Sequence, residues 1–232
     1  MDSLKTTARL AGLLWLLSAA LIGFSLIYVR SKLIVSGDAA VTVNNIVAFE
    51  SLFRAGIASS ILGHVLSLFF GLTIFRLFRG VNKTLSTALL TSLLVSVAVG
   101  IVNSFNNLVA LVLVTNADYA KAFGPEQLNA LAMTFLRVNN FGVGLVEIFT
   151  ALYLFSLGLL IMRSEYLPRI LGILLMIGAC AFPINTFTKI LIPQFYPALI
   201  TQVTMFLNAF GPLGTMLWLL SKGVNENTEK RI

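Results

Sequence analysis

The chain has 232 residues, of which 58% are hydrophobic and 11% are charged. Soluble globular domains carry about 25% charged residues, so this composition excludes an ordinary soluble fold. Several apolar runs reach the roughly 20 residues needed to cross a bilayer, and they lack the alternation of barrel strands, so we expect transmembrane helices. The formal net charge of +7 does not indicate nucleic-acid binding, because the basic residues flank the apolar segments instead of forming one patch.

The sequence offers little catalytic chemistry. It has one cysteine, Cys180, and one histidine, His64, so it has neither an intramolecular disulfide nor a Cys/His cluster for a metal ion. Nucleotide-binding glycine loops, zinc-protease motifs and nucleophile elbows are also absent. We therefore expect no metal and no cofactor, and the sequence leaves an enzymatic function undecided.

A first span is predicted at residues 10–29, after a short polar lead that contains Lys5 and Arg9. A cleaved secretory signal is the alternative interpretation, since residues 18–20 resemble a cleavage site. The apolar run continues unbroken through Ile27, which favours a retained span. Residues 30–37 are predicted to form a loop.

The next apolar region, residues 39–78, is too long for one straight span. Forty helical residues would measure about 60 Å, twice the hydrocarbon thickness. We therefore expect a break near Glu50, with a short amphipathic helix in the first outer loop and a second span at residues 51–75. Asp38 suits the N-cap of the short helix.

Four further spans are predicted at residues 84–114, 125–163, 169–192 and 198–220, with a polar loop at 116–124. Pro125 suits the first turn of its helix, and Pro183 predicts a kink. The predicted fold is all-α, a polytopic membrane protein with six transmembrane helices in one bundle. Residues 1–222 would form this single domain, and residues 223–232 a disordered cytoplasmic tail.

Basic residues predict the orientation of the six spans. Six crossings place both termini on one side, where ten basic residues lie, against four in the opposite loops. Positively charged loops stay in the cytoplasm, so both termini are predicted to be cytoplasmic. The ten are Lys5, Arg9, Arg76, Arg79, Lys83, Arg163, Arg169, Lys222, Lys230 and Arg231, and the four are Arg30, Lys32, Lys121 and Lys189.

Three stretches carry a resemblance to a known family. They read VRSKLIVSGDAAVTVNNI from residue 29, ESLFRAGI from residue 50 and YLPRILGILLMIGA from residue 166. Over nearly its whole length the chain resembles the bacterial membrane-protein family known as domain of unknown function 4386. The resemblance implies a multi-helix protein of the bacterial plasma membrane, and it implies no catalytic residues.

Polar residues concentrate in the outer half of the predicted membrane region, counting 1.5 Å per residue from the cytoplasmic helix ends. In the fourth span they share one narrow face with glycine and alanine. A polar group in hydrocarbon is costly and normally faces a partner or a watery cavity. We therefore predict a ligand-binding pocket open to the outside, formed by Arg54, His64, Asn103, Asn107, Arg137, Asn140, Glu147, Asn185, Lys189 and Asn208.

The ligand is expected to be small and anionic, or lipid-like, because three cations reach a similar depth near the outer rim. A planar guanidinium suits carboxylate or phosphate, so we expect the anion between Arg54 and Arg137. The alternative for Arg54 is an ion pair with Glu50, one helical turn earlier.

Three functions remain open. The first is a receptor or transporter that binds such a ligand and contacts membrane lipids. The second is a membrane enzyme that uses Glu147 and His64 as acid and base, and Glu147 is expected to contact His64 or Asn103. The third is a structural or assembly subunit, in which the polar side chains form interhelical hydrogen bonds.

Overall fold

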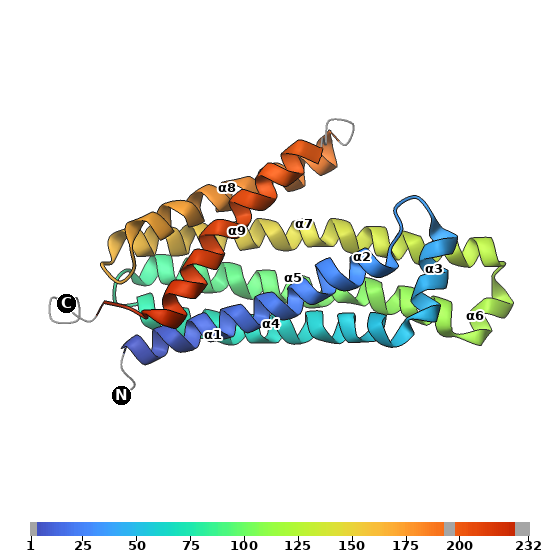
Figure 1. The fold of residues 1–232 in the computed structure, drawn as a ribbon, viewed down its shortest axis with the longest axis horizontal. Helices are drawn as coiled ribbons and strands as arrows, with labels where there is room; N and C mark the ends of the chain where they lie inside the picture. Colours follow the sequence, from blue (N-terminus) through green and yellow to red (C-terminus); the bar gives the residue numbers. More distant parts are fainter. Residues whose placement is uncertain (1–3, 193–197, 226–232) are drawn as a thin grey trace. The chain divides into compact units, whose positions relative to one another are not determined.

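The computed structural model describes residues 4–192 and 198–225 (Figure 1). Within these residues every regular element is a helix. Five of the predicted spans are confirmed as helices long and apolar enough to cross a membrane: Leu4–Leu33, Glu50–Phe78, Lys83–Thr115, Pro125–Arg163 and Arg169–Leu191. In chain order the elements are α1 (Leu4–Gly23), the π-helical η1 (Phe24–Val29), α2 (Arg30–Leu33), α3 (Ala39–Ala48), α4 (Glu50–Phe78), α5 (Lys83–Thr115), α6 (Ala117–Ala122), α7 (Pro125–Arg163), α8 (Arg169–Leu191) and α9 (Ala198–Ser221).

The first span is longer than predicted, because α1, η1 and α2 form one continuous helical stretch that ends at Leu33. The expected loop at residues 30–37 was therefore wrong for its first four residues. Leu33 is 1% exposed and lies in the hydrophobic core, so burial of its side chain favours continued helix. The chain turns at Gly37, whose φ of 86° suits glycine.

The predicted break near Glu50 is confirmed. Helix α3 ends at Ala48, Phe49 leaves the helical conformation, and α4 begins at Glu50. The predicted N-cap is also confirmed, since the Asp38 side chain accepts a hydrogen bond of 2.9 Å from the backbone N–H of Val41. The amphipathic character and outer position of α3 stay predictions.

The expected loop at residues 116–124 was wrong in part, because it contains the short helix α6. The Asn116 side chain accepts a hydrogen bond of 2.9 Å from the backbone N–H of Asp118, which caps this helix. Residues 123 and 124 remain the connection to α7.

The chain divides into two compact units, one with residues 1–17, 66–97 and 144–232 and the other with residues 18–65 and 98–143. We call them the first and the second unit. The first span, α4, α5 and α7 each contribute one part to each unit, while α8 and α9 belong to the first unit. The expectation of a single domain stays a prediction.

Small residues bring helices together in the first unit. A Cβ atom on Gly158 of α7 would lie 2.7 Å from the carbonyl oxygen of Gly172 on α8, and one on Gly172 would lie 2.8 Å from that of Gly158. The backbones of α7 and α8 are therefore in direct contact at these two glycines.

Helices α1 and α4 also pack together in the first unit. The aromatic rings of Trp15 and Phe70 stack with their centroids 4.8 Å apart.

The beginning of α1 meets the end of α9 in the first unit. Arg9 donates a hydrogen bond of 3.3 Å to the carbonyl oxygen of Ser221, and Gly223 packs against Lys5. Next to them, the backbone N–H of Asn225 donates to the carbonyl oxygen of Tyr166 at 3.2 Å. The first residues of the predicted disordered tail are therefore packed, and residues 226–232 lie outside the described part of the chain.

The second unit has its own hydrophobic core, and small residues of α4 bring the first span close to it. Gly56 of α4 faces the side chain of Val29, and Ser59 donates a hydrogen bond of 2.7 Å to the carbonyl oxygen of Leu21. Close approach over small residues is typical of helix pairs in membranes. The buried core comprises Val29, Leu33, Ile46, Phe53, Ile57, Ala110, Leu111, Met133 and Leu136.

Candidate functional site

The ten predicted site residues fall into two groups. Six lie in the second unit: Arg54, His64, Asn103, Asn107, Arg137 and Asn140. Four lie in the first unit: Glu147, Asn185, Lys189 and Asn208. Each group is described by itself, and a single site formed from both stays a prediction.

A small pocket lies within the second unit, between the first span, α4, α5 and α7. Its volume is about 20 Å³, enough for one water-sized group. Its walls are formed by Ser25, Leu26, Val29, Arg30, Ile34, Phe53, Gly56, Ile57, Asn107 and Asn139. One of the ten predicted site residues, Asn107, lines this pocket.

Two polar side chains of this pocket are free to bind something else. Among the described residues, the guanidinium group of Arg30 forms no ion pair and donates no hydrogen bond, and the carboxamide of Asn107 has no hydrogen-bond partner. Both residues are half-buried, so neither is fully solvated. Of the two other polar residues in the lining, Ser25 is half-buried, and Asn139 is 6% exposed and already paired.

Most of the carboxylates of the second unit are occupied elsewhere. Asp38 caps α3, Glu50 pairs with Arg54, and Asp118 lies 3.9 Å from the amine of Lys121. No carboxylate in the described residues neutralises Arg30. The pocket therefore holds a positive charge and amide donors without a negative partner.

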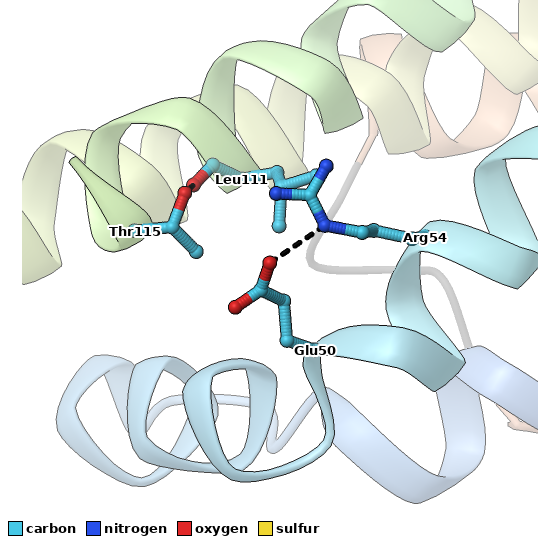
Figure 2. Close-up of polar contacts among 4 residues, drawn as sticks. All are labelled: Glu50, Arg54, Leu111 and Thr115. Atoms are coloured by element: carbon cyan, nitrogen blue, oxygen red, sulfur yellow. Dashed lines mark hydrogen bonds and ion pairs between the residues drawn. The ribbon is translucent and has the colours of Figure 1, made fainter.

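Arg54 adopts the alternative that the sequence left open. Its Nε atom lies 2.6 Å from Oε1 of Glu50, and both side chains are exposed. Figure 2 shows this pair, with the guanidinium group extending toward the last turn of α5, where Thr115 donates to the carbonyl oxygen of Leu111. Arg137 is exposed on α7. An anion between Arg54 and Arg137 stays a prediction.

Asn103 and Asn139 form a reciprocal pair between α5 and α7. The Asn103 carboxamide donates to the backbone carbonyl oxygen of Asn139 at 2.9 Å. The Asn139 carboxamide donates to the backbone carbonyl oxygen of Asn103 at 3.0 Å. Asn106 donates to the side-chain oxygen of Asn103 at 3.1 Å. Gly142 lies against the same carboxamide and leaves it room. This arrangement holds the two helices together and fixes Asn139 at the pocket wall.

His64 is 8% exposed, and its ring packs against Gly100 of α5. Its Nδ1 atom lies 2.7 Å from the carbonyl oxygen of Ser60, one turn earlier on the same helix. The described contacts of His64 are therefore those of a packed ring with a backbone partner.

Glu147 lies at the contact of α7 with α8 in the first unit. Thr186 donates to its carboxylate at 3.1 Å and lies 3.3 Å from the carbonyl oxygen of Gly144, so the predicted polar face of α7 meets α8 here. Asn185 also hydrogen-bonds to this carboxylate, and the charge of Lys189 acts on it. The expected contact of Glu147 with His64 or Asn103 joins different units and stays a prediction.

The remaining predicted residues differ in their surroundings. Asn140 is half-buried and has polar contacts of its own. The side-chain oxygen of Asn208 on α9 is buried and has no hydrogen-bond partner among the described residues. Among the residues that the structure describes, no group of three or more His, Cys, Asp or Glu side chains lies close enough together to hold a metal ion.

Comparison with known proteins assigns the chain to a family. A family model described as "Domain of unknown function (DUF4386)" matches residues 10–223. The chain belongs to this family. Neither a search of curated proteins nor a search of solved structures finds a match. The pocket of the second unit lies entirely within the DUF4386 region.

The sequence interpretation missed three polar residues that line the pocket or bond to predicted site residues in this DUF4386 chain. Arg30 was assigned to a loop, although it belongs to the first span and lines the pocket. Asn139 lies off the predicted polar face of α7, yet it pairs with Asn103. Thr186 directly follows the predicted Asn185, and its signal was weak because threonine often bonds its own helix backbone.

Proposed function

We propose that this protein is a six-span protein of the bacterial plasma membrane that binds a small anionic or lipid-like ligand in the outer half of the membrane. The observation that carries the proposal is the pocket of the second unit, where Arg30 and Asn107 have no hydrogen-bond or ion-pair partner among the described residues. Polar groups in a spanning segment are costly unless they serve a partner or a watery cavity. A ligand that supplies negative charge would satisfy both side chains.

Two observations support six spans. Helix α9 has 24 residues, or about 36 Å, which exceeds the hydrocarbon thickness of about 30 Å. The beginning of the first span lies beside the end of α9, where Arg9 contacts Ser221. A chain whose first helix begins on the side where its last helix ends crosses the membrane an even number of times. Five spans and α9 make six crossings.

The orientation follows from the basic residues near this end. The rings of Phe78 and Tyr166 lie 5.7 Å apart, so the α4–α5 and α7–α8 turns meet, and Tyr166 also bonds Asn225 just after α9. These turns are flanked by Arg76, Arg79, Lys83, Arg163 and Arg169. Loops rich in Lys and Arg remain in the cytoplasm, so we place this end and both termini there.

Thiol labelling of intact cells would test the orientation. Val81→Cys and Tyr119→Cys are each introduced into the Cys180→Ala background and treated with a membrane-impermeant maleimide. We expect labelling at position 119 and none at position 81 until the cells are permeabilised. Labelling of position 81 but not of position 119 in intact cells would reverse the proposed topology.

Ligand binding would be tested on purified protein by thermal unfolding in neutral detergent. Phosphatidylglycerol, phosphatidylcholine and short carboxylates are titrated separately. A ligand that binds only the folded protein at 100 times its Kd stabilises it by about 2.7 kcal/mol. We expect saturable stabilisation by an anionic compound and none by phosphatidylcholine. If no anionic compound shifts the unfolding transition, the proposed function is wrong.

Two alternative functions have some support. The reciprocal bonds of Asn103 and Asn139 suit a structural subunit, since they join helices without needing a ligand. The alternative of a membrane enzyme rests on Glu147 and His64, whose described partners are Thr186, Asn185 and a backbone carbonyl. Neither alternative explains why Arg30 and Asn107 line a pocket without partners.

A further inference from the structure

We infer that Arg30 is the anion-binding residue of this protein and that, together with Asn107, it takes a single carboxylate or phosphate group. The inference rests on the proposed function and assigns the ligand chemistry and the residues that recognise it. It replaces the pair Arg54 and Arg137 that the sequence suggested.

The donors at the pocket match an anion. Arg30 offers five N–H groups in a planar fork, and the Asn107 carboxamide offers two more. The Asn139 carboxamide uses one N–H for the carbonyl oxygen of Asn103 and retains another. No carboxylate lines the pocket. Arginine and amide donors without a neighbouring carboxylate suit the binding of carboxylate or phosphate oxygens.

The size of the pocket limits what enters it. A volume of about 20 Å³ admits one oxygen-sized group, so only part of an anionic headgroup lies inside. The remainder lies at the mouth, near the end of the first span.

The backbone at the pocket is also unusual. Ser25, Leu26 and Val29 all belong to η1, so one π-helical segment supplies three of the lining residues. Such segments are rare and occur frequently at functional sites. The segment is held in place where Val29 packs against Gly56 of α4. The pocket therefore has fixed walls around Arg30.

A snorkelling role would also place an arginine near a helix end. Lys32, two residues later, is exposed and serves as the matched control for that role. Arg30 differs from Lys32 because it is half-buried and lines a pocket with two asparagines. Loss of either cation changes the net charge equally, so only a specific site distinguishes the two variants.

The experiment measures binding of a fluorescent phosphatidylglycerol analogue to the full chain in neutral detergent. Wild type is compared with Arg30→Gln, Arg30→Lys and Lys32→Gln, after each is shown to retain its elution volume and its unfolding transition without ligand. We expect Arg30→Gln to weaken binding about 10- to 100-fold, as loss of charged hydrogen bonds does. Arg30→Lys should fall between, and Lys32→Gln should stay within about twofold of wild type.

Competition identifies the source of the anion. Displacement of the analogue by inorganic phosphate or acetate would assign the site to a free anion, whereas displacement by phosphatidylglycerol alone would assign it to a lipid headgroup. Either result supports an anion at Arg30 if Arg30→Gln weakens binding of the analogue as expected.

Two results would contradict the account at different levels. Wild-type affinity in Arg30→Gln, with loss of affinity in Arg54→Gln/Arg137→Gln, would overturn the assignment of Arg30 and leave the proposed function standing. Absence of saturable binding to wild type by any of these probes would overturn the proposed function itself.

Discussion

Replacing Gly158 by alanine is expected to destabilise the protein by about 1–3 kcal/mol. The new Cβ atom would lie 2.7 Å from the carbonyl oxygen of Gly172, which is backbone and cannot turn away. Helices α7 and α8 would have to separate, and with them the contact of Thr186 with Glu147. The measurement is reversible unfolding in mixed micelles, followed by tryptophan fluorescence.

The matched control is Gly23→Ala. Gly23 is helical with a φ of −61°, and a Cβ atom there would meet nothing within 4 Å. Alanine favours helix over glycine by up to about 1 kcal/mol, so this variant should be neutral or more stable. Gly172→Ala opens the same contact, so Gly158→Ala/Gly172→Ala should cost less than the sum of the two single changes. Equal stability of Gly158→Ala and wild type would show that α7 and α8 do not pack as described.

The second large effect is expected at the reciprocal asparagine pair. Asn103→Leu and Asn139→Leu each remove an interhelical donor from a buried position. Interhelical hydrogen bonds in membranes couple by about 0.6 kcal/mol on average and up to about 1.7. Each carboxamide donates to the backbone carbonyl of the other residue, so each variant breaks one bond of the pair, and we expect each to cost stability toward the upper end of that range.

Asn107→Leu is the control for these two variants. It lies one turn beyond Asn103 on α5, and its carboxamide has no hydrogen-bond partner among the described residues. Its replacement should change stability by less than about 0.5 kcal/mol. The reciprocal pair would be refuted if Asn103→Leu and Asn139→Leu left stability unchanged, or if Asn107→Leu cost as much as Asn103→Leu.

The sequence predicted the long helices well because each is a long apolar run whose ends are marked by local chemistry. Helix α7 occupies the expected range, Pro125–Arg163, since proline begins it and the apolar run ends at Arg163. The break near Glu50 was expected because 40 helical residues would measure about 60 Å, but length alone does not impose a break, since α7 runs unbroken for 39 residues. The π-helical segment η1 was not predictable in this way, because its apolar sequence, FSLIYV, suits an α-helix equally.

The candidate site was predicted less completely. Periodicity placed Gly144 and Glu147 on one face of α7, and that face does meet α8. Periodicity cannot say which face meets which neighbour, so the partner of Asn103 was not identified. Arg30 was missed because a basic residue at the end of an apolar run usually marks a loop, whereas the core contacts of Leu33 extend this helix.

An experimental structure of the protein in nanodiscs containing phosphatidylglycerol would test the central claim most directly. We predict an anionic headgroup oxygen within hydrogen-bond distance of both the Arg30 guanidinium and the Asn107 carboxamide, with Asn139 still paired to Asn103. The same density should be absent from nanodiscs made of phosphatidylcholine with Arg30→Gln protein. A pocket filled only by water, with Arg30 turned away toward solvent or paired with a carboxylate of the chain, would contradict the account.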